Sequence, residues 1–128
     1  MYTGYFAKLK QYTDAGLTPV AISRMQPAFY KGMSYTKLAP SWSILSAFKH
    51  PELIGEEHAS KETYIRRFNE EILKPLDAWQ VVSELEKMTG VDDSKIILLC
   101  YEKPTDFCHR HLVASWLNAN SFTTGEYR

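Results

Sequence analysis

The stretch KIILLCYEKPTDFCHRHLVASWLN, residues 95–118, decides the fold. Residues 96–99 form a short apolar run rich in β-branched residues, which predicts a strand buried on both faces. Pro104 and Asp106 then make a turn, and a helix is expected to begin at Cys108. One face of that helix should be buried against a sheet, because apolar residues recur at helical spacing. These residues are Leu112, Val113, Trp116 and Leu117.

Side chains that can carry chemistry flank this strand-to-helix crossover, where open α/β sheets bind ligands and a helix N-terminus offers N–H groups to an anion. Cys108, at the helix start beside Arg110, should have its thiolate favoured, as a nucleophile requires. Glu102 can orient His109 or act as a general acid or base. We therefore predict Cys108, Glu102 and His109 as catalytic residues, and Cys100 and Arg110 as substrate-binding residues. The structural alternatives are a buried packing role for Cys100 and an ion pair between Arg110 and Glu102.

The same residues carry a resemblance to a known family. LLCYEKPTDFCHRHLVASWL, residues 98–117, resembles the signature of the domain of unknown function 488 family, whose members carry Cys-x-Glu after a strand and Cys-His-Arg at the next helix start. The segments YTGYFAKLK (2–10), PVAISR (19–24) and PAFYKGMSYTKLAP (27–40) are similar to the family's other blocks. The resemblance implies a fold and a pocket, but no assigned reaction.

Length and composition predict one globular domain over residues 1–128, since 45% of residues are hydrophobic and 23% are charged. Fifteen basic residues balance fifteen acidic ones. This neutrality disfavours binding to extended duplex nucleic acid and leaves a small anionic ligand or a nucleotide as the expected partner. No apolar run is long enough to span a membrane, so we expect a cytoplasmic protein with no membrane partner. The sequence predicts no cofactor and leaves the oligomeric state open.

The two cysteines lie eight positions apart and can form a disulfide. For an intracellular protein we expect a reduced pair instead. A zinc site from Cys100, Cys108, His109 and His111 is also conceivable, but the cysteine spacing is too wide and the two histidines project to different faces of a helix. We therefore predict no metal at this site.

The N-terminal part supplies a second strand with chemistry at its carboxyl end. Residues 2–5 predict a short strand, followed by a helix that ends near Gly16, and residues 18–23 predict the next strand. If that strand runs parallel to residues 96–99, Arg24 lies level with Cys100 and can bind substrate. Gly4, at a position that the family resemblance marks, is either a turn glycine or a point of close approach to a ligand.

Residues 25–40 have no helical period, and a loop of this length suggests a cover over the carboxyl edge of the sheet. We predict that Tyr30, Lys31 and Tyr35 in this loop contact the substrate. The alternative is a solvated surface loop that its aromatic residues anchor. Those aromatics also suit a non-catalytic module that binds a nucleotide, nucleic acid or protein by stacking. Whether the protein is an enzyme stays open at this point.

The middle of the chain predicts scaffold helices. Ser41 should cap a helix with Trp42, Leu45 and Phe48 on its inner face, and residues 50–59 form a polar connector. Two further helices are expected at 61–73 and 78–89, capped by Ser60 and Asp77, and the second should end at Gly90. For the second helix we expect an inner face of Trp79, Val82, Leu85 and Met88.

Together the pattern predicts a single three-layer α/β domain, with a central, mainly parallel sheet of about four strands flanked by helices. The tail from residue 121 to residue 128 is expected to be mobile.

Overall fold

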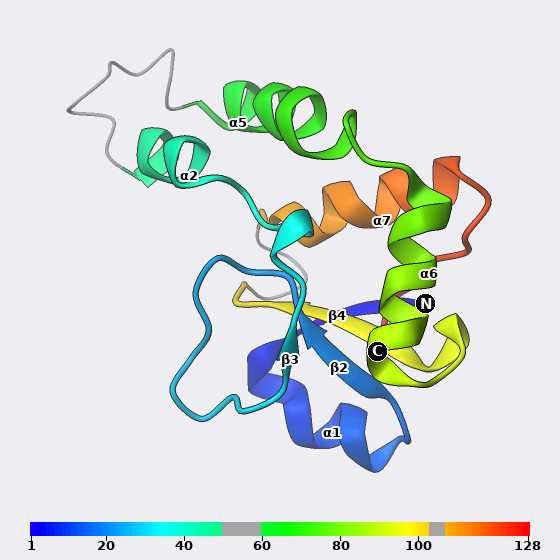
Figure 1. Cartoon of the computed structure of the whole chain (residues 1–128). Coiled ribbons are helices and arrows are strands. Elements are labelled where there is room, and N and C mark those ends of the chain that lie inside the picture. Colours follow the sequence, from blue (N-terminus) through cyan, green and yellow to red (C-terminus); the bar gives the residue numbers. More distant parts are fainter. Residues whose placement is uncertain (50–59, 103–106) are drawn as a thin grey trace.

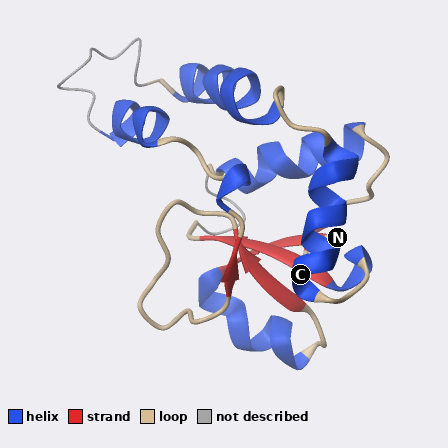
Figure 2. Ribbon diagram, viewed as in Figure 1, coloured by secondary structure: helices blue, strands red, loops and turns tan. Residues whose placement is uncertain are grey.

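The computed structural model describes residues 1–49, 60–102 and 107–128. Within these residues, five parallel strands form one sheet in the order β3-β2-β4-β1-β5. Figure 2 shows the strands side by side with helices around them. The strands are β1 (Tyr2–Tyr5), β2 (Thr18–Ala21), β3 (Met33–Ser34), β4 (Ile96–Cys100) and β5 (Gly125–Glu126). All of β4 is buried at the centre of the sheet. The α/β fold class, the parallel sheet and the buried strand are therefore confirmed.

Strand β4 pairs in parallel with β1 and β2, and the register of these pairs determines which residues meet at the candidate site. Leu99 lies opposite Gly4 of β1 and Ala21 of β2. The carboxyl ends of β2 and β4 consequently meet at one edge of the sheet. Arg24 follows β2 at that edge, and Cys100 ends β4 there.

Helices cover both faces of the sheet, as predicted (Figure 1). The turn η1 (Phe6–Lys8) and α1 (Leu9–Asp14) lie on one face. On the other face lie α6 (Ala78–Thr89) and α7 (His109–Ala119), while α2 (Trp42–Lys49) and α5 (Lys61–Arg67) lie beyond α7. Helix α5 continues as the π-helical segment η3 (Phe68–Leu73), and two short 3-10 turns, η2 (Thr36–Leu38) and η4 (Asp93–Lys95), complete the described elements.

The apolar core is split by the sheet into two clusters. On the α1 side, Ile97 and Leu99 of β4 pack with Tyr12 and Leu17. The alternate residues of the same strand face the opposite side of the sheet, where α6 and α7 lie. Leu98, for example, belongs to the larger cluster, which holds residues of α5, α6 and α7. Because successive side chains of a strand point to opposite faces, one continuous apolar run supplies both clusters.

Local capping signals locate the helix ends as predicted. Ser60 Oγ accepts a hydrogen bond from the Thr63 N–H at 3.1 Å, and Asp77 accepts one from the Trp79 N–H at 2.9 Å. Gly90 ends α6 with φ of 74°, a left-handed conformation that glycine adopts without strain.

The inner faces of two helices differ from the prediction. Trp79 is 68% exposed and Met88 is 38% exposed, and α6 instead buries Ala78, Val81, Val82 and Leu85. These four positions follow the i, i+3, i+4, i+7 spacing of one helical face, whereas a strict three-residue repeat drifts around the helix. In α2, Trp42 is 56% exposed and Ile44 is buried in its place.

Two short edge strands were not predicted. Strand β3 lies inside the loop expected at residues 25–40 and pairs with β2, with Met33 opposite Val20. Strand β5 pairs with β1, with Gly125 opposite Tyr2, so the expectation of a mobile tail is wrong. The connector at residues 50–59 and the turn at Pro104 and Asp106 lie outside the described residues. None of the helices in the described ranges has the length and apolar character needed to cross a bilayer.

Candidate functional site

A cavity of about 120 Å³ lies at the carboxyl edge of β2 and β4. The residues that follow these two strands meet there with the start of α7 and with side chains from α2 and α5. The lining residues are Ser23, Arg24, Met25, Pro40, Leu45, Phe48, Tyr64, Cys100, Tyr101, Glu102, Phe107, Cys108 and His109. The predicted residues Arg24, Cys100, Glu102, Cys108 and His109 are thus brought together.

The cavity carries one cation and one carboxylate among its described lining residues. Arg24 is half-buried, and its Nε donates to the backbone carbonyl of Pro40 at 3.1 Å. Within residues 1–49, 60–102 and 107–128, no carboxylate pairs with Arg24. Glu102 is exposed. The site can therefore offer a positive fork at one point and an acid–base group at another.

Three aromatic rings form a wall of the cavity. The ring centroids of Tyr64 and Phe107 are 5.0 Å apart, and those of Phe48 and Tyr64 are 5.2 Å apart, both in edge-to-face geometry. Burial, and then the nearby charge of Glu102, raises the pKa of the Tyr64 hydroxyl well above its ordinary value. Tyr64 therefore stays protonated and can donate a hydrogen bond. The sequence does not distinguish this wall, because Phe48 and Tyr64 have the helical spacing of ordinary core residues and Phe107 lies outside any regular element.

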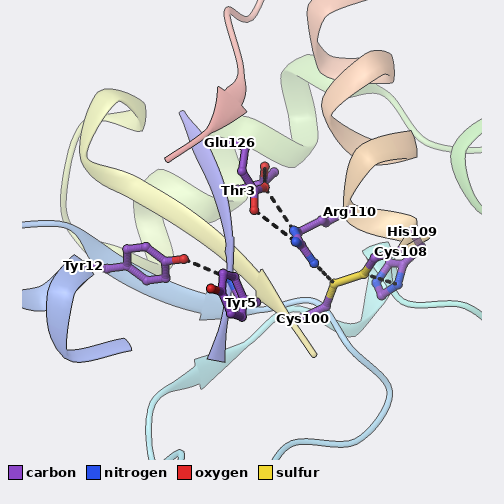
Figure 3. Close-up of polar contacts among 8 residues, drawn as sticks. All are labelled: Thr3, Tyr5, Tyr12, Cys100, Cys108, His109, Arg110 and Glu126. Atoms are coloured by element: carbon purple, nitrogen blue, oxygen red, sulfur yellow. Dashed lines mark hydrogen bonds and ion pairs between the residues drawn. A yellow bond between two sulfur atoms is a disulfide. The ribbon is translucent and has the colours of Figure 1, made fainter. Parts of the chain in front are cut away.

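Cys100 and Cys108 are joined in a disulfide (Figure 3). The expectation of a reduced pair is therefore wrong for this structure. The end of β4 and the N-cap of α7 meet at the carboxyl edge, and this brings together two sulfurs that eight positions separate. A sulfur in a disulfide is not a thiolate, so Cys108 can act as a nucleophile only after reduction.

His109 is a buried residue of the cavity lining, and its tautomer is defined. Its Nε2 lies 2.7 Å from the backbone carbonyl oxygen of Ile22, and because a carbonyl only accepts, Nε2 carries the proton. Its Nδ1 lone pair then faces Cys108 Sγ at 3.9 Å. Burial lowers the pKa of His109 to about 4, and the neighbouring charges of Arg110 and His111 act in the same direction. The imidazole is therefore neutral at neutral pH, and its Nδ1 can accept a hydrogen bond.

Arg110 is fully buried and does not line the cavity. Its Nε and Nη2 donate to the two carboxylate oxygens of Glu126 at 3.1 and 3.0 Å, and its Nη1 donates to Cys100 Sγ at 3.1 Å (Figure 3). Thr3 Oγ1 donates to the same carboxylate at 2.7 Å. The structure thus corrects the proposed pairing with Glu102: the C-terminal strand β5 supplies the partner, and Arg110 has no guanidinium nitrogen left for a ligand in the cavity.

The loop residues predicted to contact substrate lie elsewhere. Tyr30 is buried on the α1 side of the sheet, and its hydroxyl donates to the backbone carbonyl of Met33. Tyr35 is buried on the other side and donates to Glu84 at 3.1 Å. Lys31 is exposed and does not line the cavity. Tyr30 and Tyr35 thus anchor the loop in the core. This agrees with the alternative interpretation, a surface loop that its aromatic residues anchor.

The backbone at Gly4 lies close to the side chain of Tyr12. A Cβ at this position would lie 2.6 Å from the ring of Tyr12, whose hydroxyl accepts a hydrogen bond from the Tyr5 N–H at 3.2 Å. Tyr12 is buried. The lack of a side chain at Gly4 therefore makes room for Tyr12, and not for a ligand of the cavity.

Replacing Gly4 with alanine is expected to destabilise the protein by about 1–3 kcal/mol, because a methyl group forces the buried ring of Tyr12 to move. Urea unfolding measures the change. Gly125→Ala is the matched control, since a Cβ there meets nothing within 4 Å. Equal costs at the two positions would contradict the packing role of Gly4.

Metal binding can be judged from the ligand atoms. The ligand atoms of Cys100, Cys108 and His109 lie within 4.8 Å of one another, whereas His111 does not belong to this group. Zinc binds cysteine as thiolate, and the disulfide removes both thiolates. In its oxidised form this cluster therefore cannot hold zinc through the two sulfurs.

The family model DUF488-N3a, described as the active DUF488-N3 subclade, matches residues 11–121, which is most of the chain. No curated protein and no solved structure matches the chain.

Proposed function

This chain belongs to the domain of unknown function 488 family, and on that premise we propose that its cavity is the active site of an enzyme that acts on a small anionic, nucleotide-like molecule. One observation carries the proposal: Arg24, Glu102 and the neighbouring Cys108 and His109 reach the same cavity from three separate segments. The description of the matching subclade as active supports a catalytic role.

The lining suits a ligand with one anionic group and one flat ring. Arg24 can donate two parallel hydrogen bonds to a phosphate or carboxylate, and it has no carboxylate partner among the described residues. The aromatic wall of Phe48, Tyr64 and Phe107 offers apolar surface for a base. A volume of about 120 Å³ takes the anionic group or the ring of such a ligand, and it is too small for a strand of nucleic acid.

The chemistry available to this site is acid–base and, after reduction, nucleophilic. Glu102 is exposed at the cavity, so its carboxylate can take up a proton from a bound substrate. Cys108 can act as a nucleophile only after reduction and after its thiol, which can donate a hydrogen bond to Nδ1 of His109, has lost its proton to solvent.

A second candidate is a nucleotide-binding module without catalysis. The disulfide and the engagement of His109 with the Ile22 carbonyl favour it, because both tie up groups that an enzyme would use. Glu102→Gln separates the two candidates, since it removes an acid–base group and keeps the shape of the side chain. An enzyme loses turnover in this variant while ligand binding persists, whereas a binding module converts no ligand in either form.

Replacing Arg24 with alanine is expected to weaken the binding of an anionic ligand about tenfold or more, because a charge-assisted hydrogen bond contributes about 1.5–3 kcal/mol. Calorimetric titration with nucleoside monophosphates and with inorganic phosphate measures the affinity, and mass spectrometry of the incubated nucleotides detects any conversion.

Lys31→Ala is the matched control, since it removes a positive charge from the same loop but outside the cavity. It should leave the affinity unchanged. If Lys31→Ala weakens binding as much as Arg24→Ala, the anion lies on the loop and the proposed site is wrong.

A further inference from the structure

We propose that Cys100 and Cys108 form a redox-active disulfide, which a small thiol that enters the cavity reduces, and that Arg110 holds the released Cys100 as a thiolate. This inference does not depend on the ligand proposed above. It rests on the different surroundings of the two sulfurs (Figure 3).

Cys100 is the better leaving group of the two cysteines, because its surroundings stabilise a thiolate. Arg110 Nη1 donates to Cys100 Sγ at 3.1 Å, while Nε and Nη2 are held by Glu126. The arginine side chain is fully buried, so its charge is little screened by water. A guanidinium at this distance favours a thiolate, and a stabilised leaving thiolate speeds the opening of a disulfide and favours the reduced form.

Cys108 has a neutral acceptor beside it. His109 donates through Nε2 to Ile22, so Nδ1 presents a lone pair to Cys108 Sγ. That lone pair can accept a hydrogen bond from the thiol of Cys108 but cannot donate one to a thiolate. The reduced pair therefore consists of a Cys100 thiolate at Arg110 and a Cys108 thiol at His109.

The exchange takes two steps. The thiolate of a small thiol R–SH attacks Cys108 Sγ, the Cys100–Cys108 bond breaks, and Cys100 leaves as a thiolate with both bonding electrons. A second R–SH then attacks the R–S sulfur of the mixed disulfide and releases Cys108, which takes up one proton. Two R–SH are oxidised to R–S–S–R, the protein disulfide gains two electrons, and the remaining proton goes to water.

The cavity limits which thiols can react. Both sulfurs line it, yet Cys100 is only 1% exposed and Cys108 only 3% exposed. An attacking sulfur must therefore enter a space of about 120 Å³, which a small monothiol or dithiol can do and a cysteine on a folded protein surface cannot. The expected substrate class is a low-molecular-weight thiol.

A redox titration of the intact protein tests the proposal. The chain is equilibrated in buffers of varied dithiothreitol to oxidised dithiothreitol ratio, and free thiols are counted by maleimide labelling and mass spectrometry. We expect the count to change reversibly between zero and the two cysteines of the chain while circular dichroism stays native. Two free thiols under every condition, or reduction only in denaturant, would overturn the proposal.

Two variants test the part played by Arg110. Glu126→Gln frees the guanidinium from its carboxylate and should lower the thiol-to-disulfide ratio needed for half reduction. The double variant Arg110→Gln, Glu126→Gln removes both charges and should need a ratio about tenfold higher than Glu126→Gln does. Equal midpoints for these two variants would show that Arg110 does not hold the thiolate. If either variant fails to fold, the midpoint of the other against the wild type decides the point. Glu126→Gln with no shift to lower ratios, or the double variant with no shift to higher ratios, counts against the role of Arg110.

Discussion

Replacing Arg110 with alanine is expected to lower the free energy of unfolding by about 3–5 kcal/mol, because it leaves the buried carboxylate of Glu126 without its partner. The Arg110 side chain is 0% exposed and that of Glu126 is 8% exposed, so water cannot replace the lost hydrogen bonds. Chemical unfolding of the variant and of the wild type measures the difference.

Two controls sharpen this test. Lys10→Ala breaks an exposed ion pair with Asp14 and should change stability little, since solvent screens such pairs. Arg110→Met combined with Glu126→Leu should recover much of the loss, because an apolar pair of similar size leaves no buried charge. If Arg110→Ala costs no more than Lys10→Ala, then Arg110 is not a structural residue and is available as a substrate ligand.

Lowering the pH from 6.5 to about 4 is expected to remove roughly 3 kcal/mol of stability through His109 alone. In the folded protein burial lowers the pKa of His109 to about 4, whereas the unfolded chain has the ordinary value of 6.5. Between these values only the unfolded state binds the proton, so protonation favours unfolding and stability falls as the pH falls. Below about pH 4 both states are protonated, and this contribution changes no further.

His109→Gln isolates that contribution. The variant removes the titrating group and retains a donor for the Ile22 carbonyl. The slope of unfolding free energy against pH, measured across the same range, should be flatter in the variant than in the wild type. Parallel slopes would mean that His109 stays accessible to protons in the folded protein, as expected for an exposed general acid–base group.

The same variants distinguish which arginine binds a ligand in the cavity. The sequence predicted Arg24 and Arg110 as equivalent anion-binding residues, and the structure separates them: Arg24 lines the cavity, whereas Arg110 pairs with Glu126. A loss of ligand affinity with Arg24→Ala and a loss of stability with Arg110→Ala would establish the division of roles. The same comparison tells whether the cavity or the buried network binds the anion.

Local and periodic patterns in the sequence determined the framework of this protein. The apolar run at residues 96–99 predicts the buried strand because only a central strand is apolar on both faces. The caps at Ser60 and Asp77 are predictable, since a side chain there bonds an N–H only two or three residues away. Parallel pairing then places Arg24 and Cys100 at one edge, because helix-separated strands run in the same direction.

Only the tertiary structure decided the partners of the site residues. Strands β3 and β5 have two residues each and are held by backbone hydrogen bonds to a neighbouring strand, so no side-chain pattern marks them. Glu126 lies 16 residues from Arg110, and it becomes the partner because β5 pairs beside β1. The disulfide and the wall of Phe48, Tyr64 and Phe107 likewise join segments whose contact depends on how the chain packs. The sequence by itself therefore determined which edge of the sheet carries the chemistry, while long-range packing decided which side chains face the cavity and which are buried in pairs.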